Sequence, residues 1–371
     1  MRILILAPSL SGSSYLIPYL YAKVLMRKHD VKIVGPTFGK PRFVADDSVD
    51  VEEIEPLIRS PIQVGMMNMV PMNLSRLMKK DYDVVLTFKM YPHTGPVGAI
   101  AKMFTHKPVV MCIDDFDKAS PKNPFKRLVM EISDAFHVFA DWKIVLSKKM
   151  REMYGGELIY QPIDTDKDRP SRRAVDGLRR KLGLRGKIVI THIGTLYETK
   201  GIDILIKAVQ RMNRDDVKLM LFEFGKETEK YKAMSGPETI WVKKRTGEKS
   251  LDYTLMADIY AIPTRRTRYT EVQTPVKIWE SMSMGIPTVA TNLGDIPEIL
   301  ENGNAGLVIK PDSVDSLKSA LEKLVADKKL RARLGKRGRD VYVKKYHYRI
   351  QEKKILDLFD KVGKSLNNRR A

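Results

Sequence analysis

The chain has 371 residues, of which 43% are hydrophobic and 30% are charged. This length exceeds one ordinary core and predicts two domains in a globular protein. The single cysteine, Cys112, excludes an internal disulfide and a multi-cysteine zinc site. We expect it to be a small core residue of a protein in the reducing cytoplasm. No stretch reaches the ~18 uninterrupted apolar residues of a membrane-spanning helix.

Basic residues are unevenly distributed along the chain. Residues 171–371 contain 42 basic and 25 acidic side chains, which is +17 of the total net charge of +21. This surplus favours an acidic partner, such as nucleotide phosphates, nucleic acid or an anionic membrane surface. A well-solvated, lysine-rich surface explains the same composition without a partner.

Short apolar runs alternate with helical patterns in both halves. In the first half we expect strands at 2–8, 31–36, 83–88, 108–114 and 143–147, and helices at 12–29, 95–104 and from about 124. A polar, basic linker that includes a short helix is expected at 165–186. The alternation then restarts, with strands at 187–194, 217–225, 257–264, 286–291 and 305–311, helices at 200–212 and 275–285, and a helical tail from Ser313.

Strands that alternate with helices predict parallel sheets with crossover helices. Two such halves in series indicate an α/β fold with two Rossmann-like domains that face each other across a cleft. The expected domains are 1–168 and 169–350, followed by a basic helix at 351–371 that can pack back on the first domain. Ligands of such sheets bind beyond the carboxyl ends of the strands.

The stretch TEVQTPVKIWESMSMGIPTVAT, residues 270–291, contains a helix start. Thr274 followed by Pro275 is typical of an N-cap and a first helical position. Backbone N–H groups there can bind an anion, and a bound phosphate would compensate for Lys277 in the first turn. Glu280 comes one turn later, within reach of a ribose or sugar hydroxyl. The alternative is an ordinary capped helix with solvated Lys277 and Glu280.

A second stretch, HIGTLYETKGIDILIKA at 192–208, places a loop between a strand and a helix. Gly194 lets the backbone approach a ligand closely. Lys200, near the carboxyl end of the strand, can neutralise a diphosphate as a glycosyl–phosphate bond breaks. A solvated lysine at a helix start is the alternative.

Together these stretches resemble the C-terminal domain of the GT-B-fold family of retaining glycosyltransferases. GTLYETKGIDILIKA is similar to the family's G-R-L-x-x-x-K-G-x-x-x-L-I-x-A, ADIYAIPT to its aD-(apolar)4-PS, and residues 274–312 to its P-x-x-x-x-E…G-x-P…P-E…P-x-D run. The resemblance is dense from about 187 to 350 and looser before. It implies an N-terminal domain on the acceptor side and a C-terminal domain for a nucleoside-diphosphate sugar.

The resemblance also implies roles for individual residues. Lys200 contacts the donor diphosphate, and Glu280 binds the ribose. Asp114 or Asp115 falls where the family often places a histidine at the sugar and acceptor site, and Glu271 lies near the position of the family's other motif glutamate. The remaining expected donor-binding residues are Gly12, Gly194, Thr195, Thr274, Pro275, Val276 and Lys277.

The sequence departs from the family pattern in four places. Val272 stands where the first glutamate of E-x7-E is usual, so Glu271 is one residue early. A single glycine, Gly12, stands at the first turn, and VVMCIDDFD lacks the usual histidine. Thr195 replaces the arginine of the second phosphate contact, for which the candidate substitutes are Arg265, Arg266, Arg268 and Lys277. These departures leave open a reduced activity.

The segment DDFD, residues 114–117, contains Asp-x-Asp, which holds a divalent metal in the other glycosyltransferase fold. In a GT-B-like chain we expect no metal, and we expect Asp114 or Asp115 to orient the sugar or the acceptor. A solvated acidic turn is the alternative. His93, after a strand in FKMYPHTG, is a second acceptor-side candidate or else a surface-loop histidine.

Two segments indicate contact with lipid. Residues 60–80 are rich in Met and end in basic residues, and residues 120–142 combine basic, aromatic and aliphatic side chains. Each can lie on a membrane surface or flank a lipid acceptor. Apolar residues at helical spacing also form ordinary core.

The predicted function is retaining transfer of a sugar from a nucleoside-diphosphate sugar to an acceptor hydroxyl, on a lipid-linked or polysaccharide acceptor. No cofactor and no Mg²⁺ are expected, and the protein is placed in the cytoplasm or peripherally on the inner face of the membrane. Two alternatives stay open. One is a sugar-nucleotide epimerase of the same architecture, and the other is a nucleic-acid-binding protein, although no nucleic-acid motif appears and no such partner is expected.

Overall fold

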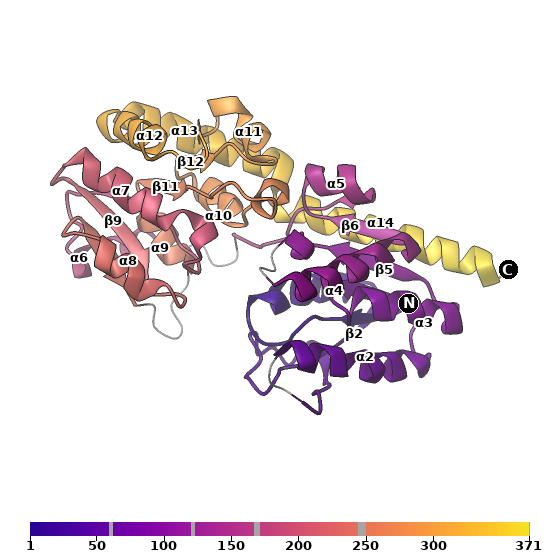
Figure 1. Ribbon diagram of the computed structural model, residues 1–371. Helices are drawn as coiled ribbons and strands as arrows, with labels where there is room; N and C mark the ends of the chain where they lie inside the picture. The colour runs from indigo at the N-terminus through magenta and orange to yellow at the C-terminus, as the bar shows by residue number, and fades with distance from the viewer. Residues whose placement is uncertain (59–61, 120–122, 167–170, 244–249, 371) are drawn as a thin grey trace. The chain divides into compact units, whose positions relative to one another are not determined.

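The computed structural model describes residues 1–370 except 59–61, 120–122, 167–170 and 244–249. The chain forms two compact units, Met1–Pro162 with Arg349–Ala371 and Ile163–Tyr348 (Figure 1). Each unit is built on one parallel sheet. The predicted α/β fold with two Rossmann-like domains is therefore confirmed.

The first unit has a seven-stranded parallel sheet in the order β3-β2-β1-β4-β5-β6-β7. Its central strands are unbroken apolar runs because both faces of the sheet are covered. The strands are β1 (Arg2–Leu6), β2 (Asp30–Gly35), β3 (Asp50–Glu53), β4 (Val84–Phe88), β5 (Val109–Ile113), β6 (Trp142–Val145) and β7 (Glu157–Leu158). The helices are α1 (Leu16–Leu25), α2 (Ile62–Met78), α3 (Gly95–Thr105), α4 (Pro124–Ala135) and α5 (Lys148–Tyr154).

The last helix, α14 (Tyr348–Arg370), joins the core of the first unit although it follows the whole second unit in sequence (yellow in Figure 1). Its buried apolar residues recur at helical spacing, so one face of the helix packs on the core. They are Ile355, Leu358, Phe359, Val362 and Leu366. The buried Gln351 side chain also accepts a hydrogen bond from the Tyr160 backbone N–H at 3.0 Å.

The second unit has a six-stranded parallel sheet in the order β10-β9-β8-β11-β12-β13. The strands are β8 (Ile188–Thr191), β9 (Val217–Phe222), β10 (Thr239–Val242), β11 (Ile259–Ile262), β12 (Thr288–Thr291) and β13 (Leu307–Ile309). The helices are α6 (Arg172–Lys181), α7 (Ile202–Met212), α8 (Thr228–Met234), α9 (Ser250–Met256), α10 (Lys277–Met284), α11 (Ile296–Ile299), α12 (Val314–Ala326) and α13 (Lys328–Val341). The predicted face of α7 is buried, including Ile202, Leu205, Ile206 and Val209.

Cys112 is a free, buried thiol on β5, as its apolar surroundings predict. Among the described helices, none combines the length and the apolar character that crossing a bilayer requires.

Candidate functional site

The strand order of the second sheet reverses between β8 and β11, and the loops after these strands meet. Gly201 has φ +66° and lies so close to the Pro263 carbonyl that a side chain there would clash with it. The Arg265 N–H donates to the Thr199 carbonyl at 2.9 Å. The Lys200 loop is therefore fixed against the end of β11, at the place where parallel sheets usually bind ligands.

A buried histidine lies at this place, and the positive charges of two lysines act on it. His192 follows β8, is 3% exposed, and its Nδ1 is 2.9 Å from the Ala261 carbonyl oxygen. Burial, with a further contribution from the positive charges of Lys200 and Lys277, lowers the pKa of His192 to about 4. The imidazole is therefore neutral at pH 7. Gly194 lies beside it, since a Cβ on Gly194 would be 3.5 Å from His192 Nε2.

Glu280 lies in the same group of residues. Its carboxylate oxygens are 2.8 and 2.9 Å from Lys277 Nζ, and its side chain is 11% exposed. Burial, and secondarily the charge of Glu280, raises the pKa of Tyr260. The Tyr260 hydroxyl in turn accepts a hydrogen bond from the Ile193 N–H at 3.1 Å. The charges of Lys200, Lys277 and Glu280 thus act on buried side chains at the ends of β8 and β11.

The start of α10 differs from the sequence prediction. The helix begins at Lys277 with Val276 at the N-cap, and no side chain caps it. The Thr274 hydroxyl donates to Asp295 Oδ2 at 3.4 Å instead of capping. Pro275 precedes the helix, where its carbonyl accepts from the Ile278 N–H at 3.1 Å. The prediction of Thr274 as N-cap and Pro275 as first helical residue was wrong because Asp295 binds the hydroxyl.

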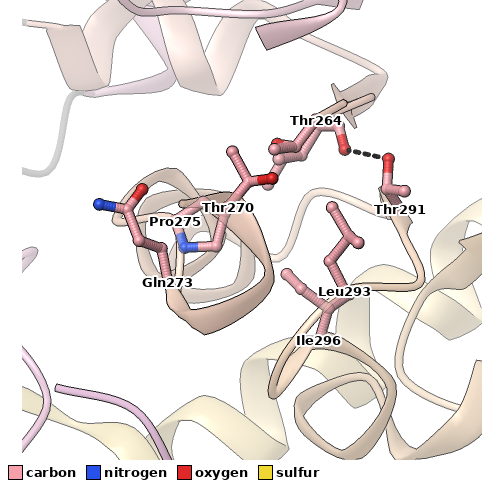
Figure 2. A pocket seen from close by; sticks show the side chains of 8 residues that line it. Thr264, Thr270, Gln273, Pro275, Thr291, Leu293 and Ile296 are labelled. Carbon is pink, nitrogen blue, oxygen red and sulfur yellow. Dashed lines mark hydrogen bonds between the residues drawn. The ribbon is translucent and has the colours of Figure 1, made fainter. Parts of the chain in front are cut away.

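A small hollow lies beyond the carboxyl ends of β11 and β12, next to α10 (Figure 2). The space in it that can hold the centre of a water molecule is about 10 Å³, and it is lined by Ile262, Thr264, Thr270, Gln273, Pro275, Thr291, Leu293 and Ile296. The buried Thr264 hydroxyl has no hydrogen-bond partner among the described residues. That space is no more than about what one water molecule requires, so the hollow by itself does not accommodate a sugar nucleotide.

Several other predicted residues lie at the margin of this group. Thr195 is exposed in the loop after β8. Glu271, in the 3-10 turn η5 (Thr270–Val272), is half-exposed and pairs with Arg266 at 3.4 Å. The Arg265 guanidinium binds Asp203 at 2.5 Å and Asp312 at 3.2 Å. Arg265 therefore forms ion pairs with carboxylates of its own unit.

In the first unit, the strand order reverses between β1 and β4, and Gly12 follows β1. Gly12 has φ +79°, is exposed, and has open space where a side chain would be. It precedes the 3-10 turn η1 (Ser13–Tyr15), whose Tyr15 N–H donates to the Gly12 carbonyl at 3.2 Å. The geometry leaves the backbone of this turn accessible.

Three carboxylates surround one buried lysine after β4 and β5. Lys89 Nζ contacts Asp115, lies 3.7 Å from Asp114 Oδ2 and 3.5 Å from Asp117 Oδ2. The Tyr91 hydroxyl donates to Asp117 Oδ1 at 3.3 Å. Asp114 is buried, and its Oδ1 accepts no hydrogen bond from the described part of the chain. The alternative of a solvated acidic turn is therefore wrong for Asp114.

Burial is the main electrostatic influence on this cluster. It raises the pKa of Asp114 and that of Asp117, and the neighbouring carboxylates add to the rise, whereas Lys89 opposes it. The three aspartates could hold a cation by their spacing, with ligand atoms within 4.8 Å of one another. The Lys89 ammonium already supplies the positive charge between them.

His93 is not a surface-loop histidine. It is fully buried, its Nε2 is 3.0 Å from the Pro8 carbonyl oxygen, and burial lowers its pKa to about 4. The contact joins the end of β1 to the loop after β4.

Sequence reasoning missed Lys89, Asp117, His192 and Tyr260. Lys89 and His192 each follow directly or closely after a buried strand, which is a signal that the sequence contains. The partners of these side chains come from other loops. Their pairing could not be read from spacing along the chain.

Comparison with solved structures defines the class of fold. The chain superimposes on sucrose-phosphate synthase from Thermosynechococcus elongatus with a TM-score of 0.81 at 16% identity, covering 98% of this chain and 100% of the other. HepE of Anabaena in complex with UDP gives a TM-score of 0.76 at 18% identity, covering 97% and 100%. The protein therefore has the GT-B fold.

Sequence comparison shows which family and which proteins part of the chain resembles. Residues 175–341 match the family described as glycosyl transferases group 1. Over 206 residues the chain is 26% identical to the GDP-mannose-dependent alpha-(1-6)-phosphatidylinositol monomannoside mannosyltransferase of Mycolicibacterium smegmatis, which covers 53% of this chain and 54% of that protein. The chain thus matches about half the length of this relative. Residues 175–341 of this chain are thus similar to the group 1 glycosyltransferases.

Proposed function

We propose that the protein transfers a sugar from a nucleoside-diphosphate sugar to an acceptor hydroxyl with retention of anomeric configuration. The observation that carries this proposal is that the charges of Lys200 and Lys277 act on the neutral His192 in the second unit, where Glu280 binds Lys277. Two cations at the carboxyl edge of a sheet suit a diphosphate, and a buried carboxylate suits ribose hydroxyls. The matched relative is named for its use of GDP-mannose, and the HepE structure contains UDP.

In this proposal the leaving diphosphate meets Lys200 as its charge develops, because a pre-placed cation stabilises a transition state that is more charged than the ground state. Gly194 and Thr195 lie along the donor, and the backbone of Thr274, Pro275 and Val276 approaches its phosphates or sugar. The two lysines supply positive charge, so we propose that transfer needs neither Mg²⁺ nor another cofactor.

Glu280 takes the role of ribose ligand. It now holds Lys277 by both carboxylate oxygens. A carboxylate has about four lone-pair positions, so it can accept hydrogen bonds from ribose hydroxyls while it keeps the lysine. Lys277 is thereby positioned beside the nucleotide and takes up part of the role of the missing arginine at Thr195.

The first unit supplies the acceptor side in this proposal. Asp114 and Asp115 orient the acceptor hydroxyl, and the leaving phosphate takes its proton as the new glycosidic bond forms on the same face of the sugar. Gly12 faces the donor through its accessible backbone. The acceptor is lipid-linked or a polysaccharide, and the name of the mannosyltransferase relative favours the former. The free Cys112 suits a cytoplasmic location.

The test begins with a thermal-shift panel of UDP-, GDP- and ADP-sugars on the full-length protein. The stabilising donor is then incubated with candidate acceptors, with and without EDTA, and the anomeric configuration of the product is read by NMR. We expect turnover that requires an acceptor, retains configuration and survives EDTA. Conversion of the donor without an acceptor would indicate an epimerase and overturn the proposal. Tight binding to DNA or RNA at moderate salt, with no sugar-nucleotide binding, would also contradict it.

Glu280→Gln provides a sharper test of the donor site. Loss of a charged hydrogen-bond acceptor costs about 1.5–3 kcal/mol, so we expect nucleotide affinity to fall roughly 10- to 150-fold. Glu322→Gln is the matched control, because Glu322 forms a partly exposed pair with Lys318 on α12. Equal affinity in the two variants would exclude Glu280 as a ribose ligand.

A further inference from the structure

The first unit carries a large exposed apolar surface on the end of α3, on α4 and on the 3-10 turn η3 (Phe136–Phe139). Its members have exposed fractions between 51% and 73%. They are Met103, Phe104, Phe125, Leu128, Ile132, Val138 and Phe139, and we call them the α4 surface. Single exposed apolar residues are common, whereas a cluster of this kind marks an interaction site.

Helix α4 turns its apolar face away from the protein. Phe125, Leu128 and Ile132 are spaced three and four residues apart and therefore lie on one side of the helix. The buried residues of α4 are polar instead. Asp134 accepts hydrogen bonds from Lys118 at 2.6 Å and from the Tyr154 hydroxyl at 2.8 Å. A helix that serves only the core of its own unit would show the opposite arrangement.

The parts of the α4 surface are held together. Helix α3 packs against both α4 and η3. Lys102 Nζ donates to the Phe139 carbonyl at 3.0 Å and lies 3.0 Å from Asp141. The exposed side chains of Met103 and Phe104 therefore come from the helix that supports η3. The surface is a fixed feature of the fold that needs no rearrangement to be presented.

Basic residues border this surface. Lys126 and Arg127 are exposed in the first turns of α4, beside Phe125 and Leu128. Lys107 follows the end of α3, close in sequence to Phe104. Glu131 is the exposed acidic residue of α4, since the Asp134 carboxylate is engaged by Lys118 and Tyr154. Aromatic and aliphatic side chains next to lysine and arginine are the composition of surfaces that lie in a bilayer interface.

We propose that the α4 surface docks on an anionic lipid bilayer. The apolar side chains enter the boundary between headgroups and acyl chains, and Lys126 and Arg127 contact lipid phosphates. The charge beside the apolar face favours this occupant over an apolar protein partner, because basic residues near a membrane surface are attracted by anionic lipids. The proposal concerns membrane attachment and stands independently of sugar transfer.

Vesicle flotation of the full-length protein tests the proposal. Vesicles of phosphatidylglycerol and phosphatidylcholine in equal parts are compared with pure phosphatidylcholine at 0.15 M salt. The apolar variant is Phe125→Ser/Leu128→Ser/Ile132→Ser, and the charge variant is Lys126→Glu/Arg127→Glu. The matched control, Leu57→Ser/Met153→Ser/Val343→Ser, changes three exposed apolar residues outside the α4 surface.

We expect wild type and control to float with the anionic vesicles. The apolar and the charge variants should each bind at least about tenfold more weakly, with circular dichroism and thermal unfolding unchanged. Raising the salt to 1 M should weaken wild-type binding, since the screening length falls to about 3 Å. Binding that survives in the apolar variant would overturn the proposal. So would a wild-type protein that ignores vesicles but forms a dimer that the apolar variant loses.

Discussion

In both units a buried histidine lies where the strand order reverses, but the charges around the two histidines differ. His93 binds the Pro8 carbonyl in the first unit, and His192 binds the Ala261 carbonyl in the second. Burial lowers the pKa of each to about 4. The Tyr91 ring lies beside His93, and its hydroxyl donates to Asp117, one of the three carboxylates around Lys89. Beside His192 lie the cations Lys200 and Lys277.

This difference shows that one topology can present two kinds of charge. Loops at the carboxyl ends of parallel strands bring polar side chains together in both units, whatever their charge. The second unit presents cations that suit a diphosphate, whereas the first presents carboxylates that suit hydroxyl groups. In each, the histidine stays neutral and joins two loops through a backbone carbonyl. Substitutions in the two groups of residues test whether their opposite charges correspond to different functions.

The largest effect is expected from Lys89→Met in the first unit. Removal of the lysine leaves buried carboxylates without a counterion, which costs about 3–5 kcal/mol of unfolding free energy at pH 7. The raised pKa values of Asp114 and Asp117 mean that the folded state binds protons more readily than the unfolded state, so acidification to pH 5 should restore stability. Urea unfolding at both pH values measures this.

Lys28→Met is the control for that experiment, because both members of the Lys28–Asp360 pair are exposed and the pair should contribute no more than about 1 kcal/mol. A Lys89→Met protein as stable as the control at pH 7 would show that the carboxylates are not held charged by Lys89.

Lys200→Ala tests the cationic side of the comparison. Loss of one group that stabilises developing charge typically lowers kcat about 10²- to 10³-fold, so we expect a loss of this size in sugar transfer. Unfolding should be unchanged, since Lys200 is only partly buried. Lys207→Ala, an exposed lysine on α7, is the matched control. Full transfer activity in Lys200→Ala would remove Lys200 from the donor site.

His93→Gln tests the feature that the two units share. An unfolded histidine takes up a proton near pH 6.5, whereas His93 does so only near pH 4. The histidine's contribution to stability is therefore complete above pH 6.5 and is lost as the pH falls toward 4, by about 2 kcal/mol at pH 5. Between pH 7.5 and pH 5, the free energy of unfolding of the variant, measured in urea, should therefore rise by this amount relative to that of wild type. If the difference in unfolding free energy between wild type and variant is the same at both pH values, His93 takes up a proton in the folded protein as readily as in the unfolded chain.

The smallest effect is expected from Glu271→Gln. Its ion pair with Arg266 is about half-exposed on both sides, so the free energy of unfolding should change by less than about 1 kcal/mol. If Glu271 contacts the transferred sugar, as the family resemblance implies, kcat should fall about tenfold, which corresponds to ~1.4 kcal/mol. Wild-type kcat in this variant would place the sugar contact elsewhere.

Much of the fold could be predicted from the sequence because parallel strands are continuous apolar runs. The expected strands at 2–8, 83–88 and 108–114 correspond to β1, β4 and β5. Less apolar or interrupted elements gave no such signal. The strand β3 contains Asp50, Glu52 and Glu53. Helix α2, which packs against α3, has Pro71 in its interior, and no helix was predicted there.

For the site, the sequence by itself determined the local pieces: Lys200 after a glycine-containing loop, Glu280 one turn into α10, and the aspartates after β5. Only the tertiary structure decided their partners. Asp295 accepts a hydrogen bond from the Thr274 hydroxyl, and Lys277 forms an ion pair with Glu280. Lys89 lies among three carboxylates. The physical reason is that backbone propensity and apolar periodicity act over a few residues, whereas burial and charge pairing depend on which loops the sheet order makes neighbours.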